Sequence, residues 1–561
     1  MGCLSDLQVA SVLGLRWLSF SCPSEKFSKS APEMVQIFLR KIAIIIQHDM
    51  KYTLYSNIIL NSLKTTLSST ESALIFDHKN RNITGVQILE SIDKIALELI
   101  GEGIKRNDRI IFLVRPSIES IIYFFALLRA GVVVVLVDPE MGQENFVSRI
   151  KFSKAHFILQ DKILEKIEKY SFIKPLLRFL NIWFPDNLPI PTQNRITVKN
   201  LEFILQRNTA GIIDEKVVDA SEDMVIIFTS GTVNKPKGVV HSYSSLFNAL
   251  NIISSEISIS KSDFLYASQF YFLLIGLMVS ARTYIPKNKT FSPESFLKIG
   301  LKFKITSAFL LPYEGELIYK YCTKNKIILP NSFKTILFGS APVTKGFLSR
   351  FSNICNLSLK VYGVYGATEM LPISLVEMQE KINYKGKGDL LGKPTKGVEI
   401  KISEDKEILV SGSQLFVKYL GDNEKAKYFY SGDLGEIDNE GNIILLGRKK
   451  DMIIRKGFNI YPTLFEVSIS KMPEIIECSI VGVYDDKTED EKIVLFVVSN
   501  RDALAFRDKL KKLLITGQYS IDSYAIPDEI IFIESMPRSG RSKKIDKKVL
   551  QYLARKKLCI Q

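Results

Sequence analysis

Histidine and cysteine are scarce in this sequence of 561 residues, and their scarcity limits the chemistry that it can support. The four histidines form no H-E-x-x-H pattern, and the six cysteines form no C-x-x-C pair. The histidines are His48, His78, His156 and His241, and the cysteines are Cys3, Cys22, Cys322, Cys355, Cys478 and Cys559. We therefore expect neither a zinc site nor a disulfide framework. Widely spaced thiols favour a cytoplasmic protein that keeps them reduced.

An uninterrupted apolar run long enough to span a membrane is also missing. The best candidate, IIYFFALLRAGVVVVLVD (121–138), is divided by Arg129 and Gly131 and changes partway from helix-forming to β-branched residues. A membrane span needs ~20 predominantly apolar residues in succession. A buried helix followed by a buried strand explains this stretch better, and no transmembrane segment is expected.

No stripe of basic residues interleaved with aromatic ones accompanies the net charge of +15. Basic residues are scattered, apart from one concentration near the C-terminus, RSKKIDKKVLQYLARKK (541–557). The charge has two readings: a surface that attracts polyanions, or the composition bias of a genome rich in Lys, Ile and Asn codons. We expect no nucleic-acid partner. The basic surface would support at most a weak peripheral contact with a membrane.

Residues 1–49 show little patterning and are expected to form an N-terminal extension, with Met34 or Met50 as an alternative start. The stretch VASVLGLRWLSFSC has no basic segment before it and contains Arg16, which argues against a signal peptide. Gly2 would suit myristoylation, but Asp6 stands where that signal has Ser or Thr.

The remaining length predicts at least two α/β domains. Between about 84 and 210, helical stretches alternate with short β-branched runs, as in VQILESIDKIALELIGEGI followed by RIIFLV. This alternation favours parallel sheets covered on both faces. Near 398–446 the pattern changes to short alternating strands, and a further α/β stretch follows the charged joint GRKKD (447–451). We place one domain at 50–448 and a second at 449–561.

A phosphate-binding segment is predicted at TSGTVNKPKG (229–238), directly after the β-branched strand 225–228. Glycines let backbone N–H groups approach phosphate oxygens, hydroxyl groups add donors, and a lysine adds a positive charge. The residues in question are Thr229, Ser230, Gly231, Thr232, Lys237 and Gly238. It is not the G-x-x-x-x-G-K-[ST] loop. An ordinary Gly/Ser loop is the alternative for the segment by itself.

This segment resembles the phosphate loop T-S-G-T-T-G-x-P-K-G of the acyl-adenylate-forming superfamily, which includes acyl-CoA synthetases. It departs from that loop at Val233 and Asn234, where a hydroxyl and a glycine are lost. Valine cannot donate a hydrogen bond to phosphate, whereas Asn tolerates a positive φ better than other non-glycine residues.

Two further segments resemble the nucleotide site of that family. VYGATEM (364–370) matches Y-G-x-T-E, which implies that Tyr365 stacks on adenine, Thr368 reaches the α-phosphate and Glu369 binds Mg²⁺. The matching turn also contains Gly366. The small-residue segment expected against adenine is Gly339, Ser340, Ala341 and Pro342.

The most specific resemblance covers YSGDLGEIDNEGNIILLGRKKDMIIRKGFNIYP (430–462), where every fixed position of the family pattern is present. It implies that Asp433 accepts both ribose hydroxyls and that Arg448 supports ribose and phosphate. It also places the hinge between domains at Lys450 and the loop that meets the thiol acceptor at Gly457.

The C-terminal catalytic lysine of the family aligns with Lys544 in SMPRSGRSKKIDKKVL, although the neighbouring Lys543 stays an alternative. An ammonium group there would stabilise the charge that develops during in-line attack on the α-phosphate. A solvated basic tail is the structural alternative. We expect His241 to hold neighbouring groups in place, because it has no visible base partner.

The resemblance spans about residues 84–550 and implies a fold and an activity. The fold is α/β: a large N-terminal domain of stacked, mostly parallel sheets flanked by helices, with a small β-structured lobe, followed by a small mobile α+β C-terminal domain. The activity is ATP- and Mg²⁺-dependent adenylation of a carboxylic acid, followed by transfer to coenzyme A or to the phosphopantetheine of an acyl carrier protein. The catalytic residues implied are Lys544, Lys237, Thr368 and Glu369.

The acid and the product are open at this stage. The apolar stretches YFLLIGLM and AFLLP favour a fatty or other apolar acid and a role in fatty acid metabolism. Phe270 and Tyr271 stand where the family has its acyl-gate histidine segment. VDPEMG and YGATEMLPIS are similar to synthetases that form a β-lactone from a β-hydroxy fatty acid. A catalytically weak nucleotide-binding homologue is the remaining alternative, motivated by Val233 and Asn234.

Overall fold

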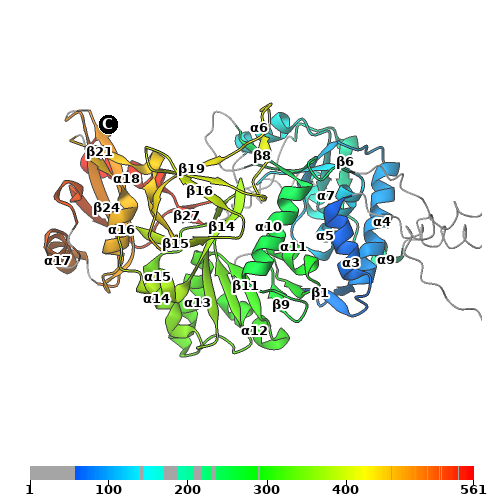
Figure 1. Cartoon of the computed structure of the whole chain (residues 1–561), viewed down its shortest axis with the longest axis horizontal. Helices are drawn as coiled ribbons and strands as arrows, with labels where there is room; N and C mark the ends of the chain where they lie inside the picture. Colours follow the sequence, from blue (N-terminus) through cyan, green and yellow to red (C-terminus); the bar gives the residue numbers. More distant parts are fainter. Residues whose placement is uncertain are drawn as a thin grey trace, which may run out of the picture. The chain divides into compact units, whose positions relative to one another are not determined.

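The fold is known from a computed structural model, which describes residues 57–138, 143–169, 188–206, 218–228, 236–287, 291–456, 458–486, 488–501, 503–516, 519, 521–540 and 543–560 (Figure 1). Contacts divide the chain into two units, Met1–Leu54 and Tyr55–Gln561, and every described residue belongs to the second. The extension expected at 1–49 lies outside the described residues.

Side-chain caps start two helices of the first α/β region. The hydroxyl of Thr84 accepts a hydrogen bond from the backbone N of Gln87 at 3.2 Å, and the Gln87 side chain accepts from the Thr84 backbone N at 3.0 Å. This reciprocal capping satisfies donors that a helix otherwise leaves unpaired, so α4 (Gly85–Gly101) begins here. Ser117 and Ser120 start α5 (Ile118–Arg129) in the same way.

The apolar stretch 121–138 is a buried helix followed by a buried strand, as predicted. Every residue of α5 is buried. Strand β4 (Val133–Leu136) follows α5 along the chain. Arg129 ends the helix, and its guanidinium pairs with Asp93 of α4 at 3.1 Å. Within the described part of the chain, none of the helices has the length and apolar character needed to cross a membrane.

One sheet has seven strands in the order β18-β8-β7-β4-β3-β5-β6. From β7 to β6 the neighbours run parallel, whereas β7–β8 and β8–β18 are antiparallel. Its strands are β3 (Arg109–Leu113), β4, β5 (Phe157–Gln160), β6 (Arg195–Thr197), β7 (Asp223–Phe228), β8 (Gly238–Ser242) and β18 (Lys418–Tyr419). The connecting helices are α6 (Gln143–Ser153), α7 (Lys162–Lys169), η3 (Thr192–Asn194) and α9 (Leu201–Gln206).

A second sheet has thirteen strands in the order β16-β17-β19-β20-β15-β14-β13-β12-β11-β9-β10-β1-β2. Neighbours from β1 to β13 are parallel, and those from β13 to β16 are antiparallel. The parallel part contains β1 (Ala73–Asp77), β9 (Phe264–Tyr266), β10 (Arg282–Ile285), β11 (Ser307–Leu310), β12 (Thr335–Phe338) and β13 (Lys360–Ala367), with β2 (Asn82–Thr84) antiparallel at the edge. The antiparallel lobe contains β14 (Met370–Glu377), β15 (Asp389–Pro394), β16 (Glu399–Ile402), β17 (Glu407–Ser411), β19 (Phe429–Ile437) and β20 (Ile443–Arg448).

Further helices connect strands of this sheet. They are α12 (Pro293–Phe303), α13 (Pro312–Asn325), α14 (Lys345–Phe351), η4 (Ser352–Ile354) and α15 (Met378–Asn383). The predicted arrangement, mostly parallel sheets flanked by helices with a small β-structured lobe, is confirmed. The strands of the lobe are antiparallel. Strand β13 continues to Ala367 and pairs with β14.

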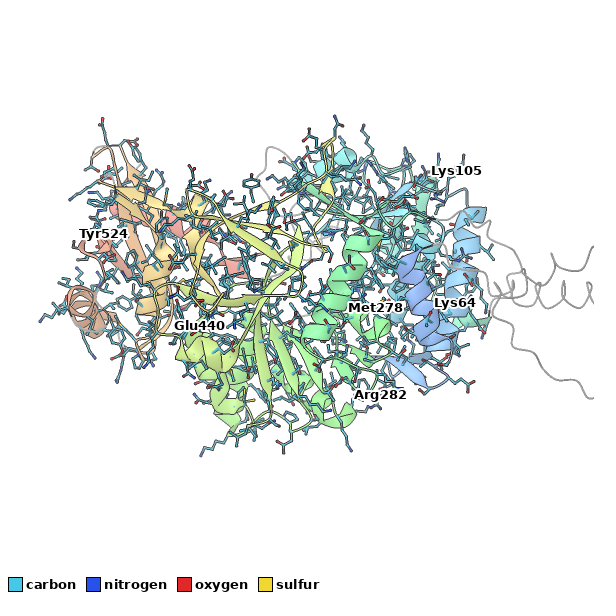
Figure 2. The ribbon with its side chains drawn as sticks, in the orientation of Figure 1. Lys64, Lys105, Met278, Arg282, Glu440 and Tyr524 are labelled. Carbon is cyan, nitrogen blue, oxygen red and sulfur yellow. The ribbon has the colours of Figure 1, made fainter. Side chains whose placement is uncertain are left out.

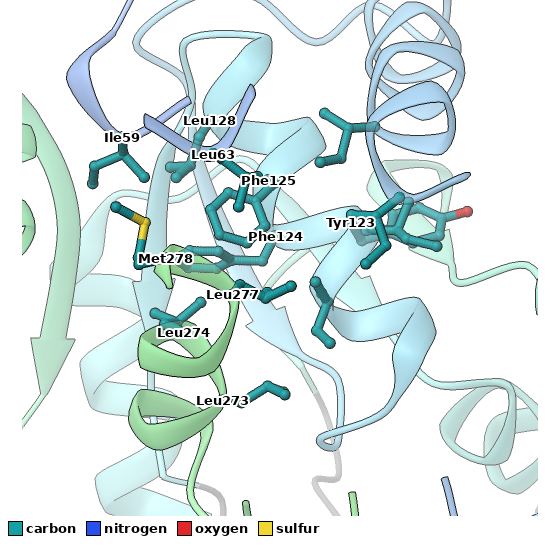
Figure 3. Packing of buried hydrophobic residues seen from close by; sticks show 14 of the residues in the cluster. Ile59, Leu63, Tyr123, Phe124, Phe125, Leu128, Leu273, Leu274, Leu277 and Met278 are labelled. Atoms are coloured by element: carbon teal, nitrogen blue, oxygen red, sulfur yellow. The ribbon is translucent and has the colours of Figure 1, made fainter. Parts of the chain in front are cut away.

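The main hydrophobic core brings together helices that are far apart in the sequence. In Figure 1, α10 (Tyr243–Glu256) and α11 (Phe270–Met278) lie beside α3 (Ile58–Leu67) and α5. Figure 3 shows Leu273, Leu274 and Leu277 of α11 packed with Phe124 of α5. Met278 is buried in this core, whereas Lys105 is exposed at the periphery (Figure 2).

This packing corrects one expectation. The apolar stretch YFLLIGLM belongs to α11, and its side chains from Phe272 to Met278 are core residues. In AFLLP, Ala308 and Leu310 belong to a second buried cluster. Burial of large apolar side chains stabilises a fold whatever the ligand is. These stretches therefore carry no information about the acid.

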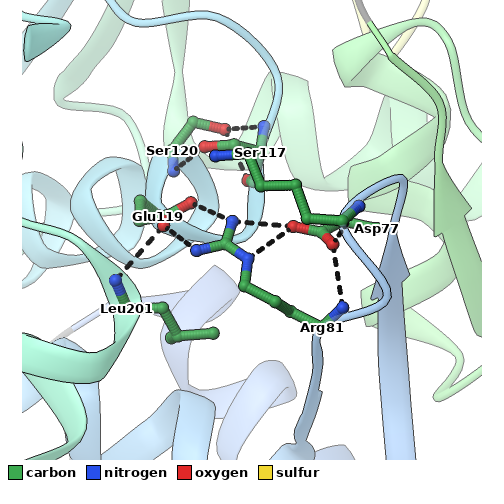
Figure 4. A network of polar contacts seen from close by, with 7 residues as sticks. Asp77, Arg81, Ser117, Glu119, Ser120 and Leu201 are labelled. Atoms are coloured by element: carbon green, nitrogen blue, oxygen red, sulfur yellow. Dashed lines mark hydrogen bonds and ion pairs between the residues drawn. The ribbon is translucent and has the colours of Figure 1, made fainter.

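A polar cluster fastens the β1–β2 turn to α5 (Figure 4). Arg81 contacts Asp77 Oδ2 at 2.7 Å and Glu119 Oε1 at 2.6 Å, and the backbone N of Leu201 donates to the same Glu119 oxygen at 3.2 Å. Burial of Glu119 would raise its pKa, but the hydrogen bond and charge of Arg81, together with further hydrogen bonds, lower the pKa overall. The cluster joins three elements within the N-terminal domain.

The C-terminal part is a small α+β domain, as predicted. Its strands β23 (Ile475–Asp485), β24 (Asp490–Ser499) and β25 (Glu529–Phe532) form one sheet. Alternate side chains divide between two buried clusters: one includes α16 (Pro462–Ile469) and α17 (Ala503–Ile515), and the other includes α18 (Lys547–Leu558). The smaller elements are η5 (Lys449–Asp451), β21 (Ile453–Arg455), β22 (Phe458–Ile460), η6 (Ser523–Ala525), β26 (Arg538–Ser539) and β27 (Lys544–Ile545).

Candidate functional site

The predicted phosphate segment connects two paired strands. Phe228 at the end of β7 is paired with Gly238 at the start of β8, so the two ends of the segment lie side by side. A Cβ atom on Gly238 would come within 3.1 Å of Ile226 and Leu420, which explains the need for glycine here. Lys237 is exposed. Thr229, Ser230, Gly231 and Thr232, with Val233 and Asn234, lie outside the described residues.

Thr368 and Glu369 form the turn of the β13–β14 hairpin, since Ala367 is paired with Met370. Neighbouring elements hold this turn by three hydrogen bonds. The Thr368 carbonyl accepts from Nε2 of His241 at 2.7 Å, and the Glu369 carbonyl accepts from the backbone N of Phe416 at 2.8 Å. The Glu369 carboxylate, which is nearly buried, accepts from the hydroxyl of Tyr419 at 2.9 Å.

His241 is a buried residue of β8 that positions Thr368. Its Nε2 faces a carbonyl oxygen, which can only accept, so we assign the hydrogen of the neutral ring to Nε2. Nδ1 lies 3.2 Å from the hydroxyl of Ser245, at the first turn of α10. Burial lowers the pKa of His241, and the hydrogen bond to Thr368 opposes this shift only in part. The expected positioning role agrees with this geometry.

A second cluster joins Tyr365, Asp433 and Arg448. The Tyr365 hydroxyl donates to Asp433 Oδ2 at 2.8 Å, and Arg448 Nε lies 2.6 Å from Oδ1. Asp433 and Arg448 are cross-strand neighbours in β19 and β20, which explains their contact. Burial raises the pKa of Asp433, while Arg448 and Tyr365 pull it down. Burial and the charge of Asp433 raise the pKa of Tyr365 well above its ordinary value.

The C-terminal domain brings Lys544 to this cluster. Lys544 is an exposed residue of β27, yet enough protein surrounds its ammonium group that desolvation lowers its pKa. The positive charges of Arg448 and Lys450 lower the pKa further, and Asp433 raises it. These interactions place the Lys544 charge near both Asp433 and Arg448. Lys543 instead has a left-handed backbone, with φ of 50°, and its carbonyl accepts from Arg538 at 2.8 Å.

The segment Gly339–Pro342 follows β12 at the edge of the sheet where Tyr365 lies. Phe338 is paired with Gly363 of β13, and Gly339 lies beside Val364. A Cβ atom on Gly339 would lie 2.8 Å from the ring of Phe309. Ser340 has φ of 62° and is exposed, and Ala341 and Pro342 continue the turn. Gly366 is exposed as well, between Tyr365 and the hairpin turn.

Glu369 fits a Mg²⁺ site shared with a nucleotide. Within the described ranges no three His, Cys, Asp or Glu residues cluster as a metal site built by the protein alone. Mg²⁺ is commonly held by one or two carboxylates together with water and substrate phosphates. Tyr419 takes only one lone pair of Glu369 Oε1, so acceptor sites remain on this single carboxylate.

Family models match both parts of the chain. The model described as AMP-binding enzyme matches residues 66–420, and that described as AMP-binding enzyme C-terminal domain matches 465–544. The chain belongs to the AMP-binding enzyme family. The acyl-adenylate-forming family that the motifs indicated is thereby confirmed, and the protein is an AMP-forming ligase of the acyl-CoA-synthetase-like class.

Several relatives of this AMP-binding enzyme match over most of its length. The 2-succinylbenzoate–CoA ligase of Geobacillus sp. (strain WCH70) is 24% identical over 84% of this chain and 93% of that protein. The amide bond synthetase McbA from Marinactinospora thermotolerans has a similar structure, with a TM-score of 0.72 and 18% identity over 88% of this chain and 99% of that one. The O-succinylbenzoate coenzyme A synthetase of Bacillus subtilis, solved with ATP and magnesium ion, has a TM-score of 0.69 and 20% identity over 87% of this chain and 99% of that one.

The sequence did not predict two residues that lie at the candidate site of this AMP-binding enzyme. Tyr419 and Phe416 hold Glu369, but the sequence around them, LFVKYLGD, contains no pattern that marks a ligand site by itself. Their role follows from the pairing of the two-residue strand β18 with β8, which joins segments far apart along the chain. Gly457, the predicted thiol-acceptor residue, lies outside the described residues.

Proposed function

We propose that this enzyme adenylates a carboxylic acid with ATP and transfers the acyl group to coenzyme A or another thiol. One observation supports this most: Tyr365 and Arg448 contact Asp433, and the charge of Lys544, from the C-terminal domain, acts on both Asp433 and Arg448. This cluster uses the residue types that a nucleotide and a reacting α-phosphate require.

In this proposal the N-terminal domain binds the nucleotide. The Tyr365 ring would stack on adenine beside Gly339–Pro342, and Asp433 would accept the two ribose hydroxyls. The carboxylate already accepts a hydroxyl from Tyr365, which shows the geometry of such a contact. The positive charge of Arg448 lowers the pKa of the buried Asp433 carboxyl and so favours its ionised form.

The adenylation step is an in-line displacement. A carboxylate oxygen of the acid attacks the α-phosphorus of ATP, the bond to the bridging oxygen breaks, and pyrophosphate leaves with that electron pair. The Thr368 hydroxyl and the ammonium groups of Lys544 and Lys237 would stabilise the oxygens on which charge develops. Mg²⁺ bound at Glu369 would neutralise phosphate charge.

The second step needs a different position of the C-terminal domain, with Lys450 as the hinge. The residues on either side of Lys450 are tied to different domains. Lys449 pairs with Asp405 of the lobe at 2.6 Å, whereas Asp451 pairs with Lys547 of α18 at 3.3 Å. Rotation at the residue between these anchors would withdraw Lys544 and present the loop with Gly457. The thiol sulfur then attacks the acyl carbon, AMP leaves, and the thiol proton passes to solvent.

The acid is the finer part of this proposal. The 2-succinylbenzoate–CoA ligases among the relatives act on an aryl acid by their names, whereas the sequence favoured a fatty or other apolar acid. Because YFLLIGLM and AFLLP are core segments, they do not decide between these classes. We therefore propose an acid with an apolar body, aryl or aliphatic, and the substrate panel must hold both.

Acid-dependent exchange of labelled pyrophosphate into ATP tests the role of Lys544. The panel contains 2-succinylbenzoate, other aryl acids and fatty acids, with β-hydroxy fatty acids among them. With the best acid, Lys544→Ala should lower the exchange rate about 100-fold, since one stabilising donor at a developing charge is worth about that much. Lys543→Ala, the adjacent lysine, should stay within about twofold of the wild type.

Equal losses in the two lysine variants would contradict the assigned role of Lys544. Wild-type exchange that is zero with every acid would instead support a catalytically weak nucleotide-binding homologue. A β-lactone formed from a β-hydroxy acid without any thiol would point to the lactone-forming alternative.

A further inference from the structure

The segment Phe416–Leu420 connects the two halves of the proposed ATP site. The backbone N of Leu420 donates to the carbonyl of Gly238 at 2.7 Å, at the end of the phosphate segment. At its other end, the backbone N of Phe416 donates to the carbonyl of Glu369 at 2.8 Å. Between them, β18 is paired with β8, with Tyr419 opposite Val239. The segment thus touches both the phosphate segment and the metal-binding turn.

Tyr419 contacts a charged side chain from each half. Its hydroxyl donates to Glu369 Oε1 at 2.9 Å, and the ammonium group of Lys237 lies 5.0 Å from the centre of its ring. The ring of Phe416, at 4.8 Å between centres, packs against the tyrosine. One side chain therefore contacts both the proposed ligand of Mg²⁺ and the proposed phosphate-binding lysine.

Each contact has a physical consequence. A hydroxyl that donates to one carboxylate oxygen fixes the orientation of the carboxylate while other lone pairs stay open to a cation. An aromatic face attracts an ammonium group within about 6 Å, which restricts a long and otherwise mobile side chain. Lys237 is exposed, and the Tyr419 ring lies against its ammonium group.

We propose that Tyr419 is a positioning residue that orients Glu369 toward the metal–phosphate complex and Lys237 toward the phosphates. This inference rests on the proposed function, because it takes Glu369 and Lys237 as ATP-site residues. In this inference the Tyr419 hydroxyl orients Glu369, and the Tyr419 ring orients Lys237.

Tyr419→Phe tests the hydroxyl by removing it and leaving the ring. Calorimetric titration with ATP, in EDTA and at a series of Mg²⁺ concentrations without any acid, separates metal-dependent from metal-independent binding. The Mg²⁺ concentration for half-maximal enhancement of ATP affinity should rise about 10-fold, the lower end for loss of a group that orients a metal ligand. ATP affinity in EDTA should stay within about twofold of the wild type.

The lobe offers a matched control with the same three groups. The hydroxyl of Tyr428 donates to Glu399 Oε1 at 2.9 Å, and Lys401 lies 4.4 Å above the Tyr428 ring, at an exposed place. Tyr428→Phe should leave both the Mg²⁺ dependence and the EDTA affinity unchanged. A Mg²⁺ dependence of Tyr419→Phe equal to that of Tyr428→Phe would overturn the inference.

The ring effect is tested by Tyr419→Leu, which removes hydroxyl and ring together. ATP affinity in EDTA should then fall several-fold beyond that of Tyr419→Phe, because Lys237 loses its aromatic partner. Lys237→Met should produce a loss of similar size, and the double variant should be no worse. Additive losses in the double variant would show that the ring and the lysine act independently.

Glu369→Gln examines the hydroxyl contact from its other side, should Tyr419→Phe prove unstable. Glutamine keeps an acceptor oxygen for the tyrosine hydroxyl, so this variant should keep the wild-type Tm while losing the Mg²⁺ enhancement. A loss of Tm in Glu369→Gln as large as that in Tyr419→Phe would show that the contact between Tyr419 and Glu369 serves only the stability of the fold. That result would overturn the inference. Wild-type protein that binds no ATP would instead remove the proposed function itself.

Discussion

Single residues at the candidate site combine burial with charge, and Asp433 shows the consequence most clearly. It is 3% exposed, and burial raises its pKa even though Arg448 and Tyr365 contact both carboxylate oxygens. A buried carboxylate whose pKa is raised by its surroundings is a feature that a stable fold does not need. It is consistent with a group kept for binding at the expense of stability.

Asp433→Asn should therefore stabilise the protein at neutral pH. A carboxyl whose pKa is higher in the folded state gives its full stability below the unfolded value of about 4, and loses it as pH rises through the folded value. We expect a gain in unfolding free energy of about 1 kcal/mol at pH 7 that shrinks toward pH 4. Urea unfolding at several pH values measures this gain.

The same variant should lose ATP binding, because the amide cannot replace a charged acceptor of two ribose hydroxyls. Lower stability at pH 7 than the wild type would show that the ion pair with Arg448 outweighs the burial penalty. That result would contradict the balance of forces described here.

At the scale of elements, the site depends on close approach between β7, β8 and β18. Gly238 lies where they meet, and a side chain there would press on Ile226, Phe228 and Leu420 at 3.1–3.2 Å. The sequence marked Gly238 as part of the phosphate segment but could not show this packing role. Strand β18 has only two residues, and its partner comes much earlier in the chain.

Gly238→Ala should displace β18 from β8 and weaken ATP binding. We expect a loss of about 1–3 kcal/mol in unfolding free energy from overpacking, together with a several-fold weaker affinity for ATP. Gly101→Ala is the matched control, because the last residue of α4 has open space around its added Cβ. Chemical unfolding and ATP titration of both variants measure the difference, and identical behaviour of the two would refute the packing argument.

At the scale of the whole molecule, the sequence predicted the class of fold. The stretch IESIIYFFALLRAG followed by VVVVLVDP indicated a buried helix and then a buried strand, because its residues change from helix-forming to β-branched. Asp433, Arg448 and Tyr365, predicted from separate motifs, meet in one cluster. The boundaries 50–448 and 449–561 remain predictions beside the matched ranges 66–420 and 465–544.

Long-range pairing was beyond the reach of the sequence. Nothing local to KYLGD indicates that Tyr419 meets Glu369, since the contact depends on how the two large sheets approach each other. The expectation of a fatty or other apolar acid lost its support from the apolar runs for a related reason. An apolar run such as YFLLIGLM looks the same whether it fills the core or lines a pocket, and here it fills the core.

The central claim is that this chain activates a carboxylic acid through its adenylate and hands the acyl group to a thiol. The most direct measurement incubates the full chain with ATP, Mg²⁺, coenzyme A and each acid of the panel, and identifies the products by mass spectrometry. The account predicts AMP and an acyl thioester in equal amounts with at least one acid, and an acyl-adenylate when coenzyme A is left out. AMP-free mixtures with every acid, or hydrolysis of ATP that no acid stimulates, would contradict it.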